Sequence, residues 1–408
     1  MSRFLRYSQK VFDLGVLVAY LKDTREKPQI PVRAIWGSAL AMFLTRRNSI
    51  NGVQIDLRWP SRMNGIVGMR KPGGDRIGQV YELMDPDSQR EILKRIHHQL
   101  SRNKALNTGW AWRFLALDGH ELFKSRRMSW KGCSKRKIKL KNKEVTEYYQ
   151  QCVVCHLIGC ELAVPIDVEL ISSQEGESTA AKRLIKRVIE NYPRFFDGVS
   201  GDALYMQAPL INLCLKHGKH VVVTAKGDKR LIMQDAQSLF DSMKPEIWRT
   251  SSHPIRVWDA EGFTSCEGVK EPLRILRTEE TTTRNEHYGD QVIQKTEVKN
   301  FWWATTMPKS LLPTKTLWQI GHARWDIEDD LFNVLAGHWG MDHCFRHHSK
   351  ATLNFLLTLF ISFILVESFY RRNLKPALRA ILTVIALRDS MHAELFNRRV
   401  LAPWFNDS

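Results

Sequence analysis

The sequence predicts an α/β protein in which a mixed sheet is flanked by helices, preceded by a helical domain and interrupted by a β-rich insertion. Three observations along the 408 residues lead to this prediction. The first hundred residues repeat apolar side chains at helical spacing, whereas the stretch after residue 106 alternates β-rich runs with amphipathic helices. Residues 237–306 contain short alternating pieces, typical of antiparallel strands, before the chain becomes helical again.

We expect residues 1–105 to form a helical domain that binds DNA. Pro31 can occupy the first turn of a helix whose apolar positions recur at helical spacing. Asp85 followed by Pro86 is a second start signal. The stretch Arg58–Arg76 between them is basic and rich in turn residues, which suits contact with DNA. A plain helical cap is the alternative, because basic surface helices are common.

The next part of the chain, residues 106–236, predicts the first part of the mixed sheet. The expected elements are, in order, strands at Arg113–Asp118, Tyr148–Leu157 and Cys160–Leu170, a helix at Glu177–Tyr192, a strand at Arg194–Val199, a helix at Ala203–Lys216 and a strand at Lys219–Ala225. Consecutive strands imply antiparallel pairing, and the later alternation implies parallel crossovers. This succession is the ribonuclease H-like order, which many nucleic-acid-cutting enzymes share. We expect residues 237–306 to form the insertion and residues 307–408 to complete the core and add C-terminal helices.

The charge of the chain indicates a polyanionic partner. Lysine and arginine outnumber aspartate and glutamate by 61 to 43, a net charge of +18, which favours nucleic acid or an anionic membrane surface. The longest apolar run, Ala351–Val366, is short for a spanning helix and contains polar residues, so it predicts a buried core helix and no membrane partner. Arg3 and Arg6 precede polar residues, so no signal peptide is expected. Seven irregularly spaced cysteines favour a reducing, cytoplasmic setting.

Two aspartates lie where predicted strands end. Asp118 ends its strand and precedes Gly119, so its carboxylate would emerge at a sheet edge, where open α/β sheets bind ligands. A simple Asp-Gly turn is the alternative interpretation. Asp202 follows the strand Arg194–Val199 and can also cap the helix after it. In a sheet of this order the two strands can be neighbours, which would bring both carboxylates to one edge.

A third carboxylate, Glu328, lies in a predicted helix. Arg324 and Glu328 are four residues apart, hence on one helix face, which Leu331 and Leu335 continue. Trp325 and other apolar neighbours predict that this helix is largely buried. A surface ion pair is the simple interpretation. A buried carboxylate, however, needs a partner, which a metal ion or an arginine can supply.

Three carboxylates at one sheet edge would suit the two-metal mechanism of phosphoryl transfer. Two Mg²⁺ ions about 3.5–4 Å apart activate water or a 3′-hydroxyl and stabilise the leaving oxygen. Carboxylate oxygens are the hard ligands that Mg²⁺ or Mn²⁺ prefers, and no cage of His and Cys is needed. The three carboxylates are therefore candidates for a site that holds two such ions.

Five segments resemble the bacterial insertion-sequence DDE transposases, most closely the group with a β-strand insertion between the second Asp and the Glu. They lie within residues 106–350 and read FLALDGHELF, RFFDGVSGDALYMQAP, KHVVVTAKGDKRLIMQDA, FWWATT and GHARWDIEDDLFNVLAGHWGMDHCF. The resemblance implies that Asp118, Asp202 and Glu328 form the catalytic, metal-binding triad. It also implies nicking of double-stranded DNA at the ends of the element, then attack of the freed 3′-hydroxyl on target DNA. A homodimer on DNA, in a bacterial cytoplasm at the nucleoid, is the expected setting.

The extended signature of this family, Tyr-x2-Arg-x3-Glu-x6-Lys, is only half present. Arg324 and Glu328 match it, but Gly321 replaces the Tyr and Leu335 replaces the Lys. Both replaced residues normally help to hold DNA phosphates, so the details of strand handling are expected to differ. Arg324 would neutralise a phosphate or orient Glu328. Three residues could substitute for the missing ones: His322, His338 and Arg346.

A dense basic run lies between the first and second predicted strands. It has ten charges in twenty residues, at Lys124, Arg126, Arg127, Lys131, Lys135, Arg136, Lys137, Lys139, Lys141 and Lys143. Such a cluster repels itself unless an anion is nearby, and the phosphate backbone of DNA is the obvious one. The residues expected to bind DNA are Lys124, Arg126, Arg127, Lys135, Arg136 and Lys137, together with Arg324. A solvated flexible loop is the alternative.

Other candidates have simpler explanations. Tryptophans such as Trp302 and Trp303 are expected to be mostly core, although related transposases stack a flipped base on an aromatic residue of this region. Cys152 and Cys155 predict buried strand cysteines rather than a zinc site, because no second cysteine pair follows.

An active DNA transposase is the function that the sequence favours. A transposase-derived DNA-binding protein without cleavage activity is one rival, suggested by Gly321 and Leu335. A ribonuclease H-like nuclease without strand transfer is another. The presence of all three carboxylates argues for the active enzyme.

Overall fold

The computed structural model describes residues 3–58, 67–68, 70–140, 143–227, 230–249, 253–288 and 291–396. The chain forms two compact units. We call Met1–Asn107, Gly119–Asn191 and Ile327–Ser408 the first unit, and Thr108–Asp118 and Tyr192–Asp326 the second unit. Strand β1 (Phe114–Ser125) contributes residues to both. Residues 59–66 and 69 of the predicted basic stretch Arg58–Arg76, Lys141 of the basic run, and residues 397–408 of the predicted C-terminal part lie outside the described residues.

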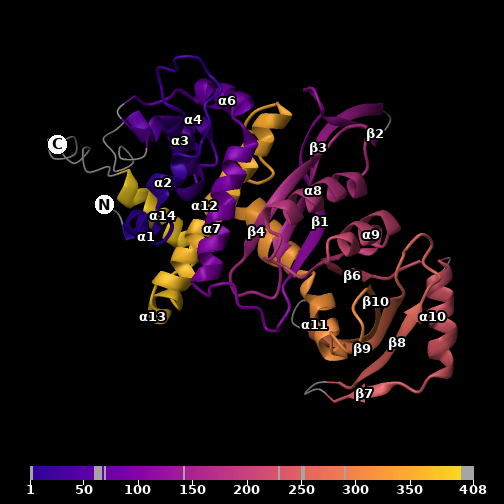
Figure 1. Ribbon diagram of the computed structural model, residues 1–408. Coiled ribbons are helices and arrows are strands. Elements are labelled where there is room, and N and C mark those ends of the chain that lie inside the picture. The colour runs from indigo at the N-terminus through magenta and orange to yellow at the C-terminus, as the bar shows by residue number, and fades with distance from the viewer. Residues whose placement is uncertain are drawn as a thin grey trace. The chain divides into compact units, whose positions relative to one another are not determined.

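Helices make up most of the first unit. In its N- and C-terminal parts the described helices are α1 (Arg3–Phe12), α2 (Leu14–Val18), α3 (Val32–Leu44), α4 (Ile50–Arg58), α6 (Gly74–Leu83), α7 (Pro86–Arg102), α12 (Ser349–Asn373), α13 (Pro376–Arg379) and α14 (Val384–Leu395). The two predicted N-terminal helices are confirmed as α3 and α7. Asp85 caps α7, since its side chain accepts a hydrogen bond from the backbone N–H of Asp87 at 3.1 Å. Helix α12 packs against α3, α6 and α7 (Figure 1).

Helix α12 contains the apolar run that the sequence analysis assigned to the core. By length and composition it could cross a membrane, but 94% of its most apolar window is buried inside the protein. Its polar residues have partners there: Gln89 donates to Asn354 Oδ1 at 2.9 Å, and Thr358 donates to Gln89 Oε1 at 2.7 Å. Because buried polar groups need such partners, α12 fits a core helix.

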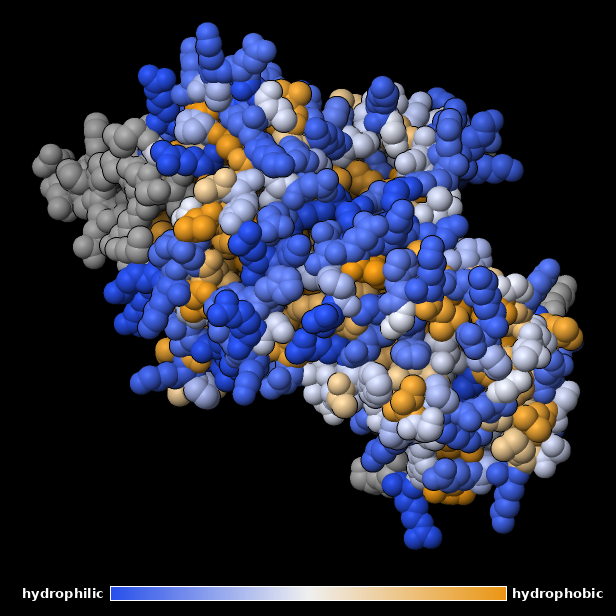
Figure 2. All heavy atoms as spheres, viewed as in Figure 1, coloured by the Kyte–Doolittle hydropathy of each residue, from blue (hydrophilic) through white to orange (hydrophobic). Residues whose placement is uncertain are grey.

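On the face shown in Figure 2, hydrophilic residues predominate and apolar residues are scattered.

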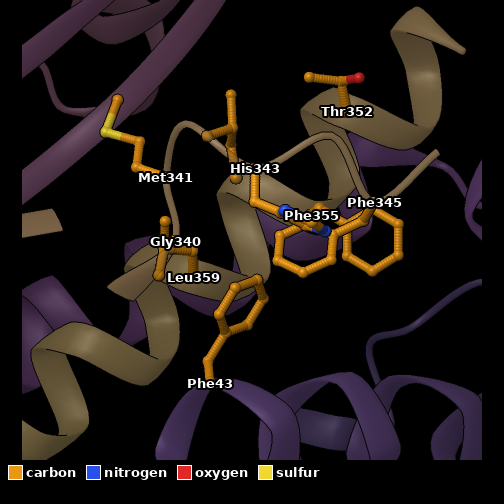
Figure 3. A pocket seen from close by; sticks show the side chains of 9 residues that line it. Phe43, Gly340, Met341, His343, Phe345, Thr352, Phe355 and Leu359 are labelled. Atoms are coloured by element: carbon orange, nitrogen blue, oxygen red, sulfur yellow. The ribbon is translucent and has the colours of Figure 1, made fainter. Parts of the chain in front are cut away.

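A small apolar cavity lies beside α12. Phe43 of α3, His343 and Phe355 are among the side chains around it (Figure 3). Its volume is about 10 Å³, which is room for at most one water molecule. We therefore regard it as a packing defect rather than a ligand site.

The first unit also contains part of the sheet. Strand β3 (Lys143–Leu157) pairs antiparallel with β2 (Ser134–Leu140) along its first half and with β4 (Val164–Ile171) along its second half. Helix α8 (Glu177–Asn191) packs on β3 and β4. Strand β2 is formed by the basic run itself. The prediction of no strand between the first two was wrong, because ion pairs with glutamates on β1 and β3 stabilise a strand whose lysines and arginines would otherwise disfavour it.

The second unit holds the rest of the sheet and the insertion. Its elements are β5 (Gly198–Gly201), the 3₁₀ turn η1 (Ala203–Tyr205), α9 (Ala208–Lys216), β6 (His220–Thr224), α10 (Leu231–Ser242), β7 (Glu246–Trp248), β8 (Ile255–Phe263), β9 (Leu273–Tyr288), β10 (Gln291–Thr305) and α11 (Thr314–Ala323). Strands β1, β5 and β6 are parallel neighbours. The insertion strands β7 to β10 are antiparallel, as predicted, and β10 also pairs with β6.

The strand order confirms the predicted fold class. The ten strands follow the order β2-β3-β1-β5-β6-β10-β9-β8-β7, with β4 beside β3. The series β4-β3-β1-β5-β6 within it has antiparallel strands first and parallel strands last, which is the ribonuclease H-like arrangement. The protein is thus a mixed α/β protein with a large mixed sheet.

Several predicted elements differ in their bounds: β3 begins earlier than predicted, at Lys143, and β4 begins later, at Val164. The strand predicted at Arg194–Val199 runs from Gly198 to Gly201, because the chain turns before it, with the backbone N–H of Phe195 donating to the carbonyl of Tyr192. The helix predicted at Ala203–Lys216 is divided into the turn η1 and α9. Pro209 explains the division, since proline is accepted in the first turn of a helix and disrupts a helix interior.

Candidate active site

Two of the predicted carboxylates belong to neighbouring strands of the second unit. Strands β1 and β5 pair in parallel, with Leu117 opposite Gly201, so Asp118 and Asp202 are the next residues along each chain. Neighbouring strands lie about 4.8 Å apart, and residues at the same register position face the same side. The prediction that these strands are neighbours is confirmed. Their register places both aspartates at the carboxyl end of the β1–β5 pair.

Asp118 does not end its strand. The sequence analysis expected a strand end or an Asp-Gly turn there, but β1 continues to Ser125. Both expectations were wrong, because the strand outlasts its pairing with β5 and continues as part of the first unit. Asp118 therefore lies on an extended backbone, with 18% of its side chain exposed.

Asp202 also serves as a cap. Its Oδ1 accepts a hydrogen bond from the backbone N–H of Leu204 at 2.8 Å, at the start of the turn η1. The expected capping role is confirmed, with a 3₁₀ turn in place of an α-helix. This hydrogen bond fixes the orientation of the carboxylate at the strand end.

Arg324 is a buried cation beside Asp118. Only 6% of the residue is exposed, and its Nη1 lies 3.4 Å from Asp118 Oδ2. Its guanidinium also lies over the indole of Trp325, 4.2 Å from the ring centroid. Trp325 is 46% exposed, so its predicted burial was wrong. The sequence analysis expected Arg324 to act on Glu328 or a phosphate, and the structure adds Asp118 as a partner.

Glu328 belongs to the first unit and lies on an irregular turn. Residues Ile327–Phe332 form a π-helical turn, η2, and Leu335–Trp339 form a second one, η3. The regular helix expected across Arg324 and Glu328 was wrong, since α11 ends at Ala323. Ile327 and Leu331 are fully buried, while Glu328 is partly exposed. The two turns are joined by α-helical residues, and π-helical turns within helices are frequent at functional sites.

The two departures from the extended signature have packing explanations. A side chain at Gly321 would meet the indole of Trp303, since a Cβ built there lies 2.5 Å from that ring. Leu335 is 0% exposed, so this position is part of the core. Trp303 and the core packing thus occupy the two places where the family signature has Tyr and Lys.

The three residues suggested as substitutes differ in their surroundings. His338 is exposed, and Arg346 pairs with Glu82 at 2.5 Å. His322 lies 2.9 Å from Glu280, which also accepts a hydrogen bond from Trp318. Burial raises the pKa of Glu280, but its hydrogen bonds from His322, Thr278 and Trp318 outweigh this and hold the pKa below its ordinary value. The pair of His322 and Glu280 is therefore a structural feature of the second unit.

The donor set at the strand ends suits a hard divalent cation. Asp118 and Asp202 supply carboxylate oxygens, the ligands that Mg²⁺ and Mn²⁺ prefer. Across the described residues, no group of three or more His, Cys, Asp or Glu is placed so that it could hold a metal ion. Asp118 and Asp202 belong to the second unit and Glu328 to the first. Cys152 and Cys155 are buried on β3 as expected, and burial raises the pKa of the Cys152 thiol above its ordinary range.

The basic run has two different faces on strand β2. We call Lys135, Lys137 and Lys139 the lysine row; they alternate along β2 and are all exposed. Arg136 lies on the other face, where it bonds Glu121 at 2.7 Å and Glu147 at 2.6 Å. These two carboxylates raise the pKa of Arg136 further above its ordinary value.

Three basic residues before β2 differ in their contacts with carboxylates. Arg126 also contacts Glu147, at 3.3 Å. Lys124 and Arg127 are exposed. Arg126 is exposed as well, so contact with Glu147 and exposure to solvent coexist there. Lys137 of the lysine row also pairs with Glu144, at 3.1 Å.

Trp303 is buried, as expected for core, whereas Trp302 is half-buried. Trp302 lies 5.6 Å from the ring of Phe240, with the guanidinium of Arg277 at 5.0 Å from its own centroid. The same guanidinium lies over Trp258 at 4.6 Å. Trp303 is 3% exposed.

Comparison with known proteins identifies the family. The family model described as "Transposase DDE domain" matches residues 127–365. The chain is similar to a piggyBac transposase solved by cryo-EM as a synaptic complex with hairpin DNA, with 12% identity over 93% of this chain and 84% of that one, and a TM-score of 0.37. No curated protein sequence matches the chain. Since the family model covers more than half of the sequence, the chain belongs to the DDE transposase family.

Proposed function

We propose that this transposase nicks double-stranded DNA at the ends of its element and joins the freed 3′-hydroxyl to target DNA. Asp118, Asp202 and Glu328 would be the catalytic residues and would hold two Mg²⁺ or Mn²⁺ ions. The observation that carries the proposal is the parallel register of β1 and β5, with Asp118 and Asp202 directly after the paired residues Leu117 and Gly201.

Each residue has a distinct part in this proposal. Bound divalent ions would activate the attacking oxygen and stabilise the leaving oxygen of an in-line phosphoryl transfer. Asp118 and Asp202 would bind from the end of the paired stretch of β1 and β5, and Glu328 would complete the site from the turn η2. Arg324 would balance the negative charge of Asp118 and lie ready to contact a phosphate, because its guanidinium is buried within 3.4 Å of that carboxylate.

The basic hairpin would bind the DNA backbone. Along a strand, every second residue advances about 6.7 Å, so the lysine row would present three cations over roughly 13 Å on one face. Lys124, Arg127 and these lysines are exposed and suit phosphate contacts. Arg126 and Arg136 would act mainly by stabilising the hairpin through Glu147. Two DNA ends would be paired by a homodimer in the bacterial cytoplasm.

The first experiment tests the three carboxylates. Asp118→Asn, Asp202→Asn and Glu328→Gln are each expected to reduce Mg²⁺-dependent nicking of element-end duplexes by about 10³-fold or more. DNA binding in a mobility-shift assay should stay close to that of the parent. Asp329→Asn is the matched control, because Asp329 is an exposed carboxylate on the same turn as Glu328. Parent-like nicking by Asp118→Asn would remove that residue from the site.

The same assay distinguishes the rival functions. A chain that shifts element-end DNA and never nicks it, with Mg²⁺ or with Mn²⁺, is a DNA-binding protein. A chain that nicks without regard to the terminal repeats, and forms no joined product, is a nuclease without strand transfer.

A second experiment tests the lysine row. Changing Lys135, Lys137 and Lys139 together to Gln should lower DNA affinity about tenfold and reduce the slope of log affinity against log salt by about 3. The control changes three exposed lysines of the second unit, Lys216, Lys244 and Lys270, to Gln. Because both variants lose the same charge, equal effects on DNA affinity would contradict a specific role for the lysine row.

A further inference from the structure

A histidine close to the first aspartate connects three elements of the first unit. His120 lies on β1, and its Nε2 is 2.7 Å from Asp342 Oδ1. Its ring also packs on Phe332, with centroids 4.6 Å apart and a tilt of 31°. Phe332 ends the turn η2, and Asp342 follows the turn η3. One imidazole thus contacts the last residue of η2 and the segment that follows η3.

The contacts of His120 lie close in sequence to two of the three proposed catalytic carboxylates. Residues two apart on a strand face the same side, so His120 lies on the same face of β1 as Asp118. Phe332 is four residues after Glu328 on the turn η2. The imidazole therefore contacts the turn that carries the third carboxylate, and it does so from the strand that carries the first.

The opposite face of β1 is also held at this point. Gly119 alternates with His120, and a Cβ built on it would lie 2.2 Å from Glu177 Oε2. Glu177 is in the first turn of α8. A side chain at this position would displace the Glu177 carboxylate, so α8 lies close to β1 on this face, while His120 makes its contacts on the other.

From these contacts we propose that His120 is a positioning residue of the transposition reaction. Through its contacts with Phe332 and Asp342, His120 holds the turn η2 against β1. This contact would fix the position of the Glu328 carboxylate for binding a divalent ion. The inference rests on the proposed function, since it assumes that Glu328 is a metal ligand. His120 itself contacts neither DNA nor metal in this role.

The test separates ion binding from folding. In His120→Ala the turn loses its contact with β1. The Mg²⁺ concentration for half-maximal nicking should therefore rise at least fivefold, and the rate at saturating Mg²⁺ should fall about tenfold. Mn²⁺ binding without DNA, measured from the electron paramagnetic resonance of unbound Mn²⁺, should weaken by a similar factor. Affinity for element-end DNA should stay within twofold of the parent.

Conservative substitutions and a double variant test whether His120 and Asp342 act together. Asp342→Asn and His120→Gln keep a hydrogen-bonding group and should restore most of the Mg²⁺ affinity lost in the alanine variants. The double variant of His120→Ala with Asp342→Ala should be no worse than His120→Ala alone, as expected for residues that act as one unit.

A second His–Asp pair provides the control. His392 of α14 lies 2.9 Å from Asp56 of α4 in the helical part of the same unit. His392→Ala removes a similar interaction and should leave the Mg²⁺ requirement unchanged.

The outcomes separate this inference from the proposed function. A parent chain that nicks, with a His120→Ala variant that keeps the parental Mg²⁺ requirement and Mn²⁺ affinity, overturns the positioning role alone. Equal shifts in His392→Ala and His120→Ala also overturn it, since they indicate general destabilisation. A parent chain that never nicks overturns the proposed function and this role together.

Discussion

Asp118 and Asp202 are held by strand pairing, whereas Glu328 is held by side-chain packing around an irregular turn. The parallel pairing of β1 with β5 fixes the two aspartates at one register position. The turn η2 depends on the buried side chains of Ile327, Leu331 and Phe332. A paired strand end allows little adjustment, while a packed turn moves when its packing changes. This difference predicts which substitutions eliminate the site and which only loosen it.

The largest effect is expected from a charge placed in the packing that holds the turns. Leu335→Lys would install the signature lysine at a position that is 0% exposed. An ammonium group buried without a partner should destabilise the fold by about 3 kcal/mol or more, which lowers Tm by roughly 6–12 °C. Differential scanning calorimetry measures the effect. His338→Lys, at an exposed position of the same turn, should leave Tm nearly unchanged. An unchanged Tm in Leu335→Lys would show that the turn η3 can open to solvent.

The next effect compares the strand end with the turn directly. Asp202→Glu moves the carboxylate outward by one methylene from a fixed strand end, so single-turnover nicking should fall by about 100-fold. Glu328→Asp withdraws the carboxylate by the same length, but the packed turn can follow, and a loss of roughly tenfold is expected. Equal losses in the two variants would mean that η2 is as rigid as the strand pair.

The smallest effect is expected from the cation beside Asp118. Arg324→Met removes a guanidinium that, in the proposed function, would compete with a divalent ion for that carboxylate. Half-maximal nicking should therefore need about two- to threefold less Mg²⁺, although the maximal rate should fall about tenfold through loss of the cation. Rates measured across a Mg²⁺ titration give both numbers. Arg277→Met is the control, because Arg277 lies between Trp258 and Trp302 in the same unit. A higher Mg²⁺ requirement in Arg324→Met would mean that the arginine orients Asp118 for the ion.

Regular features of the fold could be predicted from the sequence because local signals specify them. Proline and aspartate mark the starts of α3 and α7, and apolar runs mark β1 and β6. The order of strands and helices then favours one sheet topology, in which β1 and β5 are neighbours. The placement of Asp118 beside Asp202 follows from that topology.

Features that depend on partners distant in the sequence could not be predicted. The strand β2 needs Glu121 and Glu147 to offset the charge of Arg136. These partners lie on other strands, so the sequence of β2 alone does not predict the pairing. The π-helical form of η2 arises from packing rather than from residue preferences. The contact of His120 with Asp342 joins residues 222 positions apart. An imidazole two residues after Asp118 was visible in the sequence, but its partner was not.

Strand β10 has a practical consequence for anyone who redesigns the insertion. One end of this strand, at Trp303 to Thr305, is bonded to β6, and the rest is one arm of a long hairpin with β9. Deleting the whole insertion would therefore remove β10, a strand of the central sheet. Shortening has to begin at the far tip, where Tyr288 faces Gln291, and remove matched residues from both arms. Related proteins with a shorter or longer hairpin should therefore differ in its length and share the pairing of β10 with β6.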